Sequence, residues 1–288
     1  MRWVLLLLPV SIAWPQDPAI NRALDYLSRE VPAWKKKNGC FSCHNNGDAA
    51  RALMAAGRRE PLTETLAWLA TPEQWDHQQA DAEFRDKDLA RIQFAFALTE
   101  SVERGFLDRG AALTEAAKRL AAMQQPDGSW TVDQESNVGS PATYGSALAT
   151  YAAIRTLRAA GSHEAAVQRA TSWLQGLKAS STPDLAAKIL ASRDADAAAK
   201  LQAAQNPNGG WGPYRASPSE VFDTAIAILA LQPLGNTPAI ERGVQWLKQN
   251  QLPDGAWEGT TRPSGSISYA QHMSTTGWAT LALIQAQP

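Results

Sequence analysis

Two kinds of helical pattern alternate along the chain. Residues 111–123 are amphipathic and rich in Ala, Leu and charge, whereas residues 225–231 (AIAILAL) are apolar and small on nearly every face. An amphipathic helix buries one face, and a helix that is apolar all round is buried on all sides. A Ser217-Pro218-Ser219-Glu220 capping box predicts where the second kind of helix begins in this part of the chain. The alternation predicts an all-α fold with an outer and an inner layer of helices.

One short motif occurs three times with the same spacing. Residues 120–130, 201–211 and 247–257 align without a gap, and each ends in Pro-Asp-Gly-x-Trp or Pro-Asn-Gly-x-Trp. The Pro-Asp-Gly and Pro-Asn-Gly steps stop the preceding helix with turn chemistry. A repeat of this length predicts stacked helical hairpins. The shared positions are Gln124, Gly128 and Trp130, then Gln205, Gly209 and Trp211, then Gln251, Gly255 and Trp257.

The helix that leads into the motif also has copies. Arg22, Arg169 and Arg242 occupy the same position in three such helices, each followed by a small residue and, further on, by an aromatic residue and Leu. Residues 18–110 repeat weakly and residues 111–288 repeat clearly. We expect residues 14–288 to form a single domain.

These residues carry a resemblance to a known family. The run at residues 242–247 (RGVQWL), with Gln251, Gly255 and Trp257 after it, resembles the QW repeat of squalene-hopene and oxidosqualene cyclases, which are relatives of protein prenyltransferase β subunits. The resemblance implies an α/α toroid, a closed ring of helical hairpins. It also implies that the QW residues brace helix ends, and an amide beside a stacked indole is suited to that role.

The catalytic motif of the family is incomplete in this chain. Its cyclases protonate the substrate with a buried aspartic acid in an Asp-x-Asp-Asp-Thr-Ala motif, and the matching stretch here is residues 220–225 (EVFDTA). Phe222 stands where the proton donor belongs, so we expect no triterpene cyclase of the usual mechanism. Asp223 remains the catalytic candidate, because the matching positions 145–147 and 275–277 carry no acid. Its ordinary role would be that of a first-turn carboxylate stabilised by the helix dipole.

Net charge and the N-terminal segment indicate which partners and which cellular location the protein has. The 288 residues hold 27 Lys+Arg against 28 Asp+Glu, a net charge of −1, without a basic stripe that would suit nucleic acid. Arg2, an apolar run and the small residues Ser11 and Ala13 predict a signal peptide at residues 1–13 and an exported, periplasmic or secreted protein. This run is too short to span a bilayer, so we expect no transmembrane segment in the mature chain.

A second motif carries candidate chemistry of its own. Cys40, Cys43 and His44 form a Cys-x-x-Cys-His sequence, the attachment pattern of c-type haem, in which His44 ligates the iron. Three alternatives compete with haem: a Cys40–Cys43 disulfide, a redox-active dithiol, and a zinc site completed by another histidine. A haem would imply an electron-transfer partner, and the lysines at 35–37 are either a solvated stretch or a guide for an anionic one.

The sequence is therefore consistent with two candidate functions. The first is a ligand-binding or scaffold toroid, with or without haem, whose central cavity takes an apolar or polymeric ligand. The second is a diverged enzyme that acts on an isoprenoid or polysaccharide with Asp223 as its acid. Tyr214, Tyr269 and Trp278 either line the cavity or pack in the core, and we favour packing.

Overall fold

The computed structural model describes residues 17–78, 87–132, 145–235, 237–260 and 269–287, and the predicted signal peptide lies outside them. These residues form helices and no strand, which confirms the all-α prediction. None of the described helices is long and apolar enough to cross a membrane.

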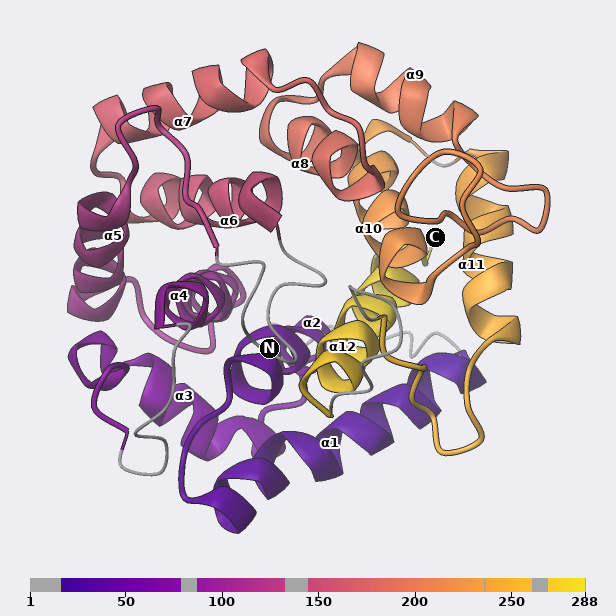
Figure 1. Ribbon diagram of the computed structural model, residues 1–288. Coiled ribbons are helices and arrows are strands. Elements are labelled where there is room, and N and C mark those ends of the chain that lie inside the picture. Colours follow the sequence, from indigo (N-terminus) through magenta and orange to yellow (C-terminus); the bar gives the residue numbers. More distant parts are fainter. Residues whose placement is uncertain (1–16, 79–86, 133–144, 236, 261–268, 288) are drawn as a thin grey trace, which may run out of the picture.

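The helices form two concentric rings (Figure 1). Outer helices alternate with inner ones along the chain, so the inner helices all run in the same direction. The outer ring consists of α1 (Pro18–Asn38), α3 (Thr63–Leu69), α5 (Ala111–Met123), α7 (Glu164–Gly176), α9 (Ala195–Ala203) and α11 (Pro238–Gln249). The inner ring consists of the π-helix η1 (Cys43–Ala49) with α2 (Ala50–Ala55), then α4 (Lys87–Glu103), α6 (Gly145–Ala160), α8 (Thr182–Ser192), α10 (Val221–Leu231) and α12 (Tyr269–Gln285). Three short 3-10 turns, η2 (Glu60–Leu62), η3 (Pro72–Gln74) and η4 (Gln232–Leu234), complete the elements.

The inner ring is closed. Each inner helix packs on the next from α4 to α12, and η1 packs on both α4 and α12. Helix α10 is buried along its whole length, as its sequence predicts. The α/α toroid is therefore confirmed, and the weakly repetitive N-terminal residues supply the first two hairpins of the ring.

Each QW motif lies in the turn from an outer helix to the inner helix that follows it, and hydrogen bonds clamp this turn to the next outer helix. In each turn the indole Nε1–H donates to a leucine carbonyl ten residues earlier, at 2.9 Å for Trp130, 2.7 Å for Trp211 and 2.8 Å for Trp257. The glutamine amide donates to the first turn of the following outer helix, at Ala166 in α7, Ala239 in α11 and Ala19 in α1. Arg169, Arg242 and Arg22 of those helices donate to the oxygens of Gln124, Gln205 and Gln251. The last of these turns brings residues 232 positions apart together and closes the outer ring.

Two expectations about local structure are wrong. Ser217 does not cap α10: its hydroxyl donates to Tyr214 O (2.7 Å) and closes a tight turn, and the helix begins only after Glu220. The register of the third inner helix also differs. The backbone N–H of the QW tryptophan donates to Thr150, Thr224 or Thr276, so residues 149–151, rather than 145–147, correspond to residues 223–225. Asp223 is still the acid among these three triplets, since Ala149 and Thr275 occupy its position.

Candidate functional site

The Cys-x-x-Cys-His segment lies where the chain turns from α1 into the inner ring. Cys40 is half-buried in this connection, and Cys43 is the buried first residue of η1. No disulfide joins the two cysteines. The Ser42 hydroxyl accepts from the backbone N–H of His44 at 3.2 Å and so caps the helix that begins there.

Buried amides fix this segment to the neighbouring helices. Asn46 is 1% exposed, and its amide donates to Thr65 Oγ1 (2.8 Å) and to Val31 O in α1. Its oxygen accepts from the backbone of Ser42 at 3.0 Å. Asn45 donates from the other side to Tyr269 Oη in α12 (3.0 Å). The residues that follow Cys43 are therefore held rigidly, in a π-helix of the kind often found at functional sites.

A buried chain of polar groups reaches from His44 into the ring. His44 Nδ1 lies 2.8 Å from Ser274 Oγ in α12, and that hydroxyl donates to Asp48 Oδ2 at 2.7 Å. Gln93 in α4 donates to the same carboxylate oxygen at 2.7 Å. Because Ser274 gives its one proton to Asp48, it accepts the proton of His44 Nδ1, and the lone pair of the imidazole is left on Nε2.

Burial shifts the pKa values of His44 and Asp48, the two titratable groups of this polar network. It lowers the pKa of His44 to about 4, so the imidazole is neutral at neutral pH. Burial also raises the pKa of Asp48, against the opposing effects of nearby Arg51 and of the hydrogen bonds from Ser274 and Gln93. A neutral histidine whose Nδ1–H is held by a carboxylate through a hydroxyl is the form in which histidine binds metals.

The order of these groups does not suit a hydrolase triad. In such a triad the histidine lies between the serine and the acid and takes the serine proton. Here Ser274 lies between His44 and Asp48, and its proton points to the acid. The hydrogen bonds that join Ser274 to His44 and Asp48 position His44 and do not activate Ser274.

The zinc alternative finds no support in this part of the molecule. Within the described residues, no three His, Cys, Asp or Glu side chains lie close enough together to hold a metal ion. His272, which packs edge-on against Tyr26, places its Nε2 at 3.1 Å from the phenol oxygen of that residue.

Asp223 lies in the first turn of α10 and is fully buried. Phe222, at the position of the family's proton donor, is also fully buried and packs edge-on against Trp278 at 5.8 Å. Asp223 lines neither the groove between α7, α8 and α9 nor the cavity at one mouth of the inner ring.

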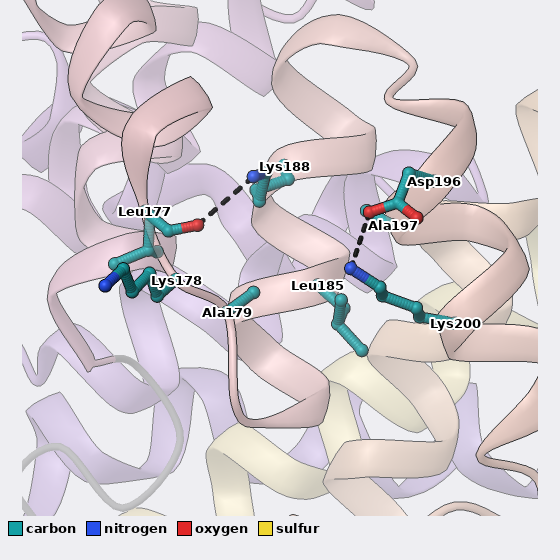
Figure 2. Close-up of a pocket in the computed structure, with 8 residues that line it drawn as sticks. All are labelled: Leu177, Lys178, Ala179, Leu185, Lys188, Asp196, Ala197 and Lys200. Carbon is teal, nitrogen blue, oxygen red and sulfur yellow. Dashed lines mark hydrogen bonds and ion pairs between the residues drawn. The ribbon is translucent and has the colours of Figure 1, made fainter.

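The groove between α7, α8 and α9 has a volume of about 340 Å³ (Figure 2). Lys188 Nζ donates to Leu177 O at 3.2 Å, and Lys200 Nζ pairs with Asp196 at 2.6 Å. Lys188 thus links the inner helix α8 to the end of α7, whereas Lys200 is paired within α9. The second cavity, of about 300 Å³, lies at the opposite mouth of the inner ring from Cys43 and is lined in part by Arg51 and Trp278.

The comparisons with known proteins agree with the fold. A squalene–hopene cyclase of Zymomonas mobilis subsp. mobilis is 36% identical over 75 residues, which cover 22% of this chain and 11% of that protein. The match thus spans about a tenth of the cyclase's length. No protein-family model matches the chain.

Solved structures resemble nearly the whole chain. The type II terpene cyclase MstE from Scytonema, solved with geranylgeranyl dihydroxybenzoate, superposes with a TM-score of 0.60 at 13% identity, covering 93% of this chain and 98% of that one. A wild-type glycosidase superposes with a TM-score of 0.62 at 14% identity, covering 94% and 99%. The chain is therefore cyclase-like in its fold, which confirms the resemblance seen in the sequence.

Sequence reasoning missed the inner members of the site. Asp48 could have been noticed, because it lies about one helical turn after His44. Ser274 and Gln93 carry no such sign, since they come from helices far away in the sequence.

Proposed function

We propose that this protein is an exported, cyclase-like toroid that carries a covalent c-type haem on Cys40, Cys43 and His44. The state of His44 supports the proposal most: the imidazole is neutral, and its Nδ1–H is directed to Ser274, which leaves Nε2 free to ligate. The ring is then the housing of a redox group.

The donor set fits a haem. Cys40 and Cys43 are two thiols with the spacing that thioether attachment needs, and His44 follows directly. When bound, haem supplies one-electron redox chemistry. Ser274 and Asp48 orient the imidazole and increase its basicity. Lys36 and Lys37, exposed at the end of α1, favour an anionic electron-transfer partner.

An absorption spectrum and an intact mass test the proposal. The full chain, expressed in a host that matures c-type cytochromes, should show a Soret band and a mass gain of one haem that survives denaturation. Cys40→Ala should lose one of the two thioethers, and His44→Ala should change the spectrum. A colourless protein with a mass two hydrogens below the reduced chain would instead establish the Cys40–Cys43 disulfide. N-terminal sequencing that found Met1 on exported protein would contradict cleavage of the signal peptide.

A second experiment measures the role of the polar chain. Ser274→Ala removes the acceptor of His44 Nδ1, so the midpoint potential of the haem should rise as the imidazole becomes a weaker donor. Thr280→Ala is the matched control, because its hydroxyl donates within the same helix to Thr276 O at 2.7 Å. An equal shift in both variants would remove Ser274 from this role.

The second candidate is a diverged enzyme that uses Asp223 as an acid. The position of Asp223 favours this function: the carboxyl is buried at the start of an inner helix, in the stretch that matches the family's catalytic motif. The related folds of a terpene cyclase and a glycosidase suggest isoprenoids and polysaccharides as substrates to assay. Turnover that is lost in Asp223→Asn and kept in Cys40→Ala would establish this function instead.

A further inference from the structure

The mouth of the inner ring opposite Cys43 holds a buried cation, Arg51, two of whose nitrogens lack a hydrogen-bond acceptor within the described residues. Arg51 in α2 is 4% exposed, and its guanidinium carbon lies 3.7 Å from the ring centre of Phe96 and 4.5 Å from that of Trp278. Its Nε and Nη1 are buried and make no hydrogen bond within the described residues. Contact with two aromatic rings offsets only part of the cost of burying a charge. Nε and Nη1 lack an acceptor within the described residues.

The acids nearby are already engaged. Burial alone would raise the pKa of Glu100, but Arg155, Arg51 and Arg104 outweigh it and hold that pKa below its usual value. Glu100 pairs with Arg104 at 2.6 Å and with Arg155 at 3.1 Å. Arg155 also pairs with Glu103.

Positive charge therefore predominates at this mouth. Arg193, exposed at the end of α8, adds a further cation to the lining of the cavity. Asp48 is the third acid near Arg51, and it accepts from Ser274 and Gln93. The C-terminal ends of the inner helices face this mouth, and their partial negative charge disfavours binding of an anion there. The positive charge of the arginines offsets this effect.

The other wall of the cavity is apolar. Leu190 in α8, Leu229 in α10 and Leu234 in η4 line it, and Leu234 is 42% exposed at the rim. A volume of about 300 Å³ suits a small molecule and excludes a polymer. The cavity thus combines an arginine edge with a hydrocarbon surface.

We propose that this cavity binds a carboxylate with a short hydrocarbon tail, with the head on the edge of Arg51 and the tail along Leu229 and Leu234. A carboxylate fits the two parallel donors of a guanidinium edge, and Arg193 closes the rim over it. The proposal goes beyond the haem function, because it depends on none of Cys40, Cys43 and His44.

Calorimetric titration of the full chain with decanoate, below its micelle concentration, tests the site. Decanoate should bind saturably at one site. Decanol lacks the charge and acetate lacks the tail, so each should bind at least 10-fold more weakly than decanoate. Arg51→Met should weaken decanoate binding at least 10-fold and leave decanol binding unchanged. Arg58→Met is the matched control: it removes the same charge from the partly exposed end of the same hairpin and should change the affinity less than 2-fold.

Stability separates a binding role from a structural one. Arg51→Met removes a cation that favours the ionised forms of Glu100 and Asp48, so the unliganded variant should fold but melt at a lower temperature than the parent. If Arg51→Met fails to fold, Arg51 is structural, and the test passes to Arg193→Gln, a change at an exposed residue. Arg193→Gln should weaken decanoate binding about 3-fold, and unchanged binding would then overturn the proposal. Equal binding of decanoate and decanol, or no saturable binding, would also overturn it. Decanoate binding should persist in Cys40→Ala, so failure of the haem proposal leaves this result unaffected.

Discussion

Gly255 lies at the contact that closes the ring, and replacing it with alanine is the sharpest test of that contact. A Cβ at this position would lie 2.3 Å from Arg22 O and 2.5 Å from Arg22 C in α1. Both atoms are backbone, so they cannot move aside as a flexible side chain would. The glycine also has a φ of +98°, which side chains rarely adopt.

The expected cost has two parts. The backbone conformation contributes about 1–2 kcal/mol, and forcing a methyl group into a packed contact contributes about 1–3 kcal/mol. Restricting the unfolded chain returns about 0.4–1 kcal/mol. Gly255→Ala should therefore lower the free energy of unfolding by about 1–5 kcal/mol.

Urea unfolding followed by circular dichroism measures this loss, and Gly235→Ala is its control. Gly235 has a φ of +119°, at least as unfavourable, but a Cβ there meets nothing within 4 Å. Its replacement should cost about 0–2 kcal/mol, from backbone conformation alone. If the two variants lost the same stability within about 0.5 kcal/mol, the contact between the last QW turn and α1 would not stabilise the fold, and its role in closing the ring would be refuted.

Three further results are expected from unfolding experiments. Trp211→Phe leaves Leu201 O without its 2.7 Å hydrogen bond and should cost at least 1–3 kcal/mol, about the effect of one buried unsatisfied group. In the haem-free chain the pKa of His44 is lowered from 6.5 to about 4, so between these pH values the unfolded state binds a proton that the folded state does not. The stability of this form should fall by up to about 3 kcal/mol as the pH drops from 6.5 to 4, and His44→Gln should remove this part of the pH dependence. Glu100→Gln leaves two arginines without their buried acid and should cost about 3–5 kcal/mol, whereas Glu103→Gln, at a side chain 40% exposed, should cost under about 1 kcal/mol in thermal unfolding.

Local chemistry made much of the fold readable from the sequence. Pro-Asp-Gly turns and helical periodicity act over a few residues, so α5 begins and ends where its pattern predicts, at Ala111 and Met123. The capping box at Ser217 failed for a local reason as well: the same hydroxyl can close a turn on Tyr214, and that alternative is adopted. The resemblance implied a closed ring, but the part that residues 18–110 play in closing it was not readable, because it depends on Gln251 meeting α1.

The candidate site, too, could be predicted only in part from the sequence. The spacing of Cys40, Cys43 and His44 is visible in five residues. The partner that fixes the imidazole, Ser274, lies 230 residues away, and only the closed ring brings α12 beside η1. Arg51 was equally hidden, since no local pattern shows that the rings of Phe96 and Trp278 lie against its guanidinium group.

The position of the Cys-x-x-Cys-His segment within the repeat explains how a ring of this kind can hold chemistry outside its central cavity. The turns after α5, α9 and α11 are occupied by QW clamps, whose tryptophan and glutamine are bound to backbone carbonyls. The turn after α1 connects an outer to an inner helix in the same way, but without a QW motif. Gln78 donates to Phe41 O at 3.0 Å and accepts from Phe41 N, and Asn46 bonds to Thr65 and Val31. Because Gln78 and Asn46 brace this turn, Cys40 is left for chemistry that the QW turns do not carry.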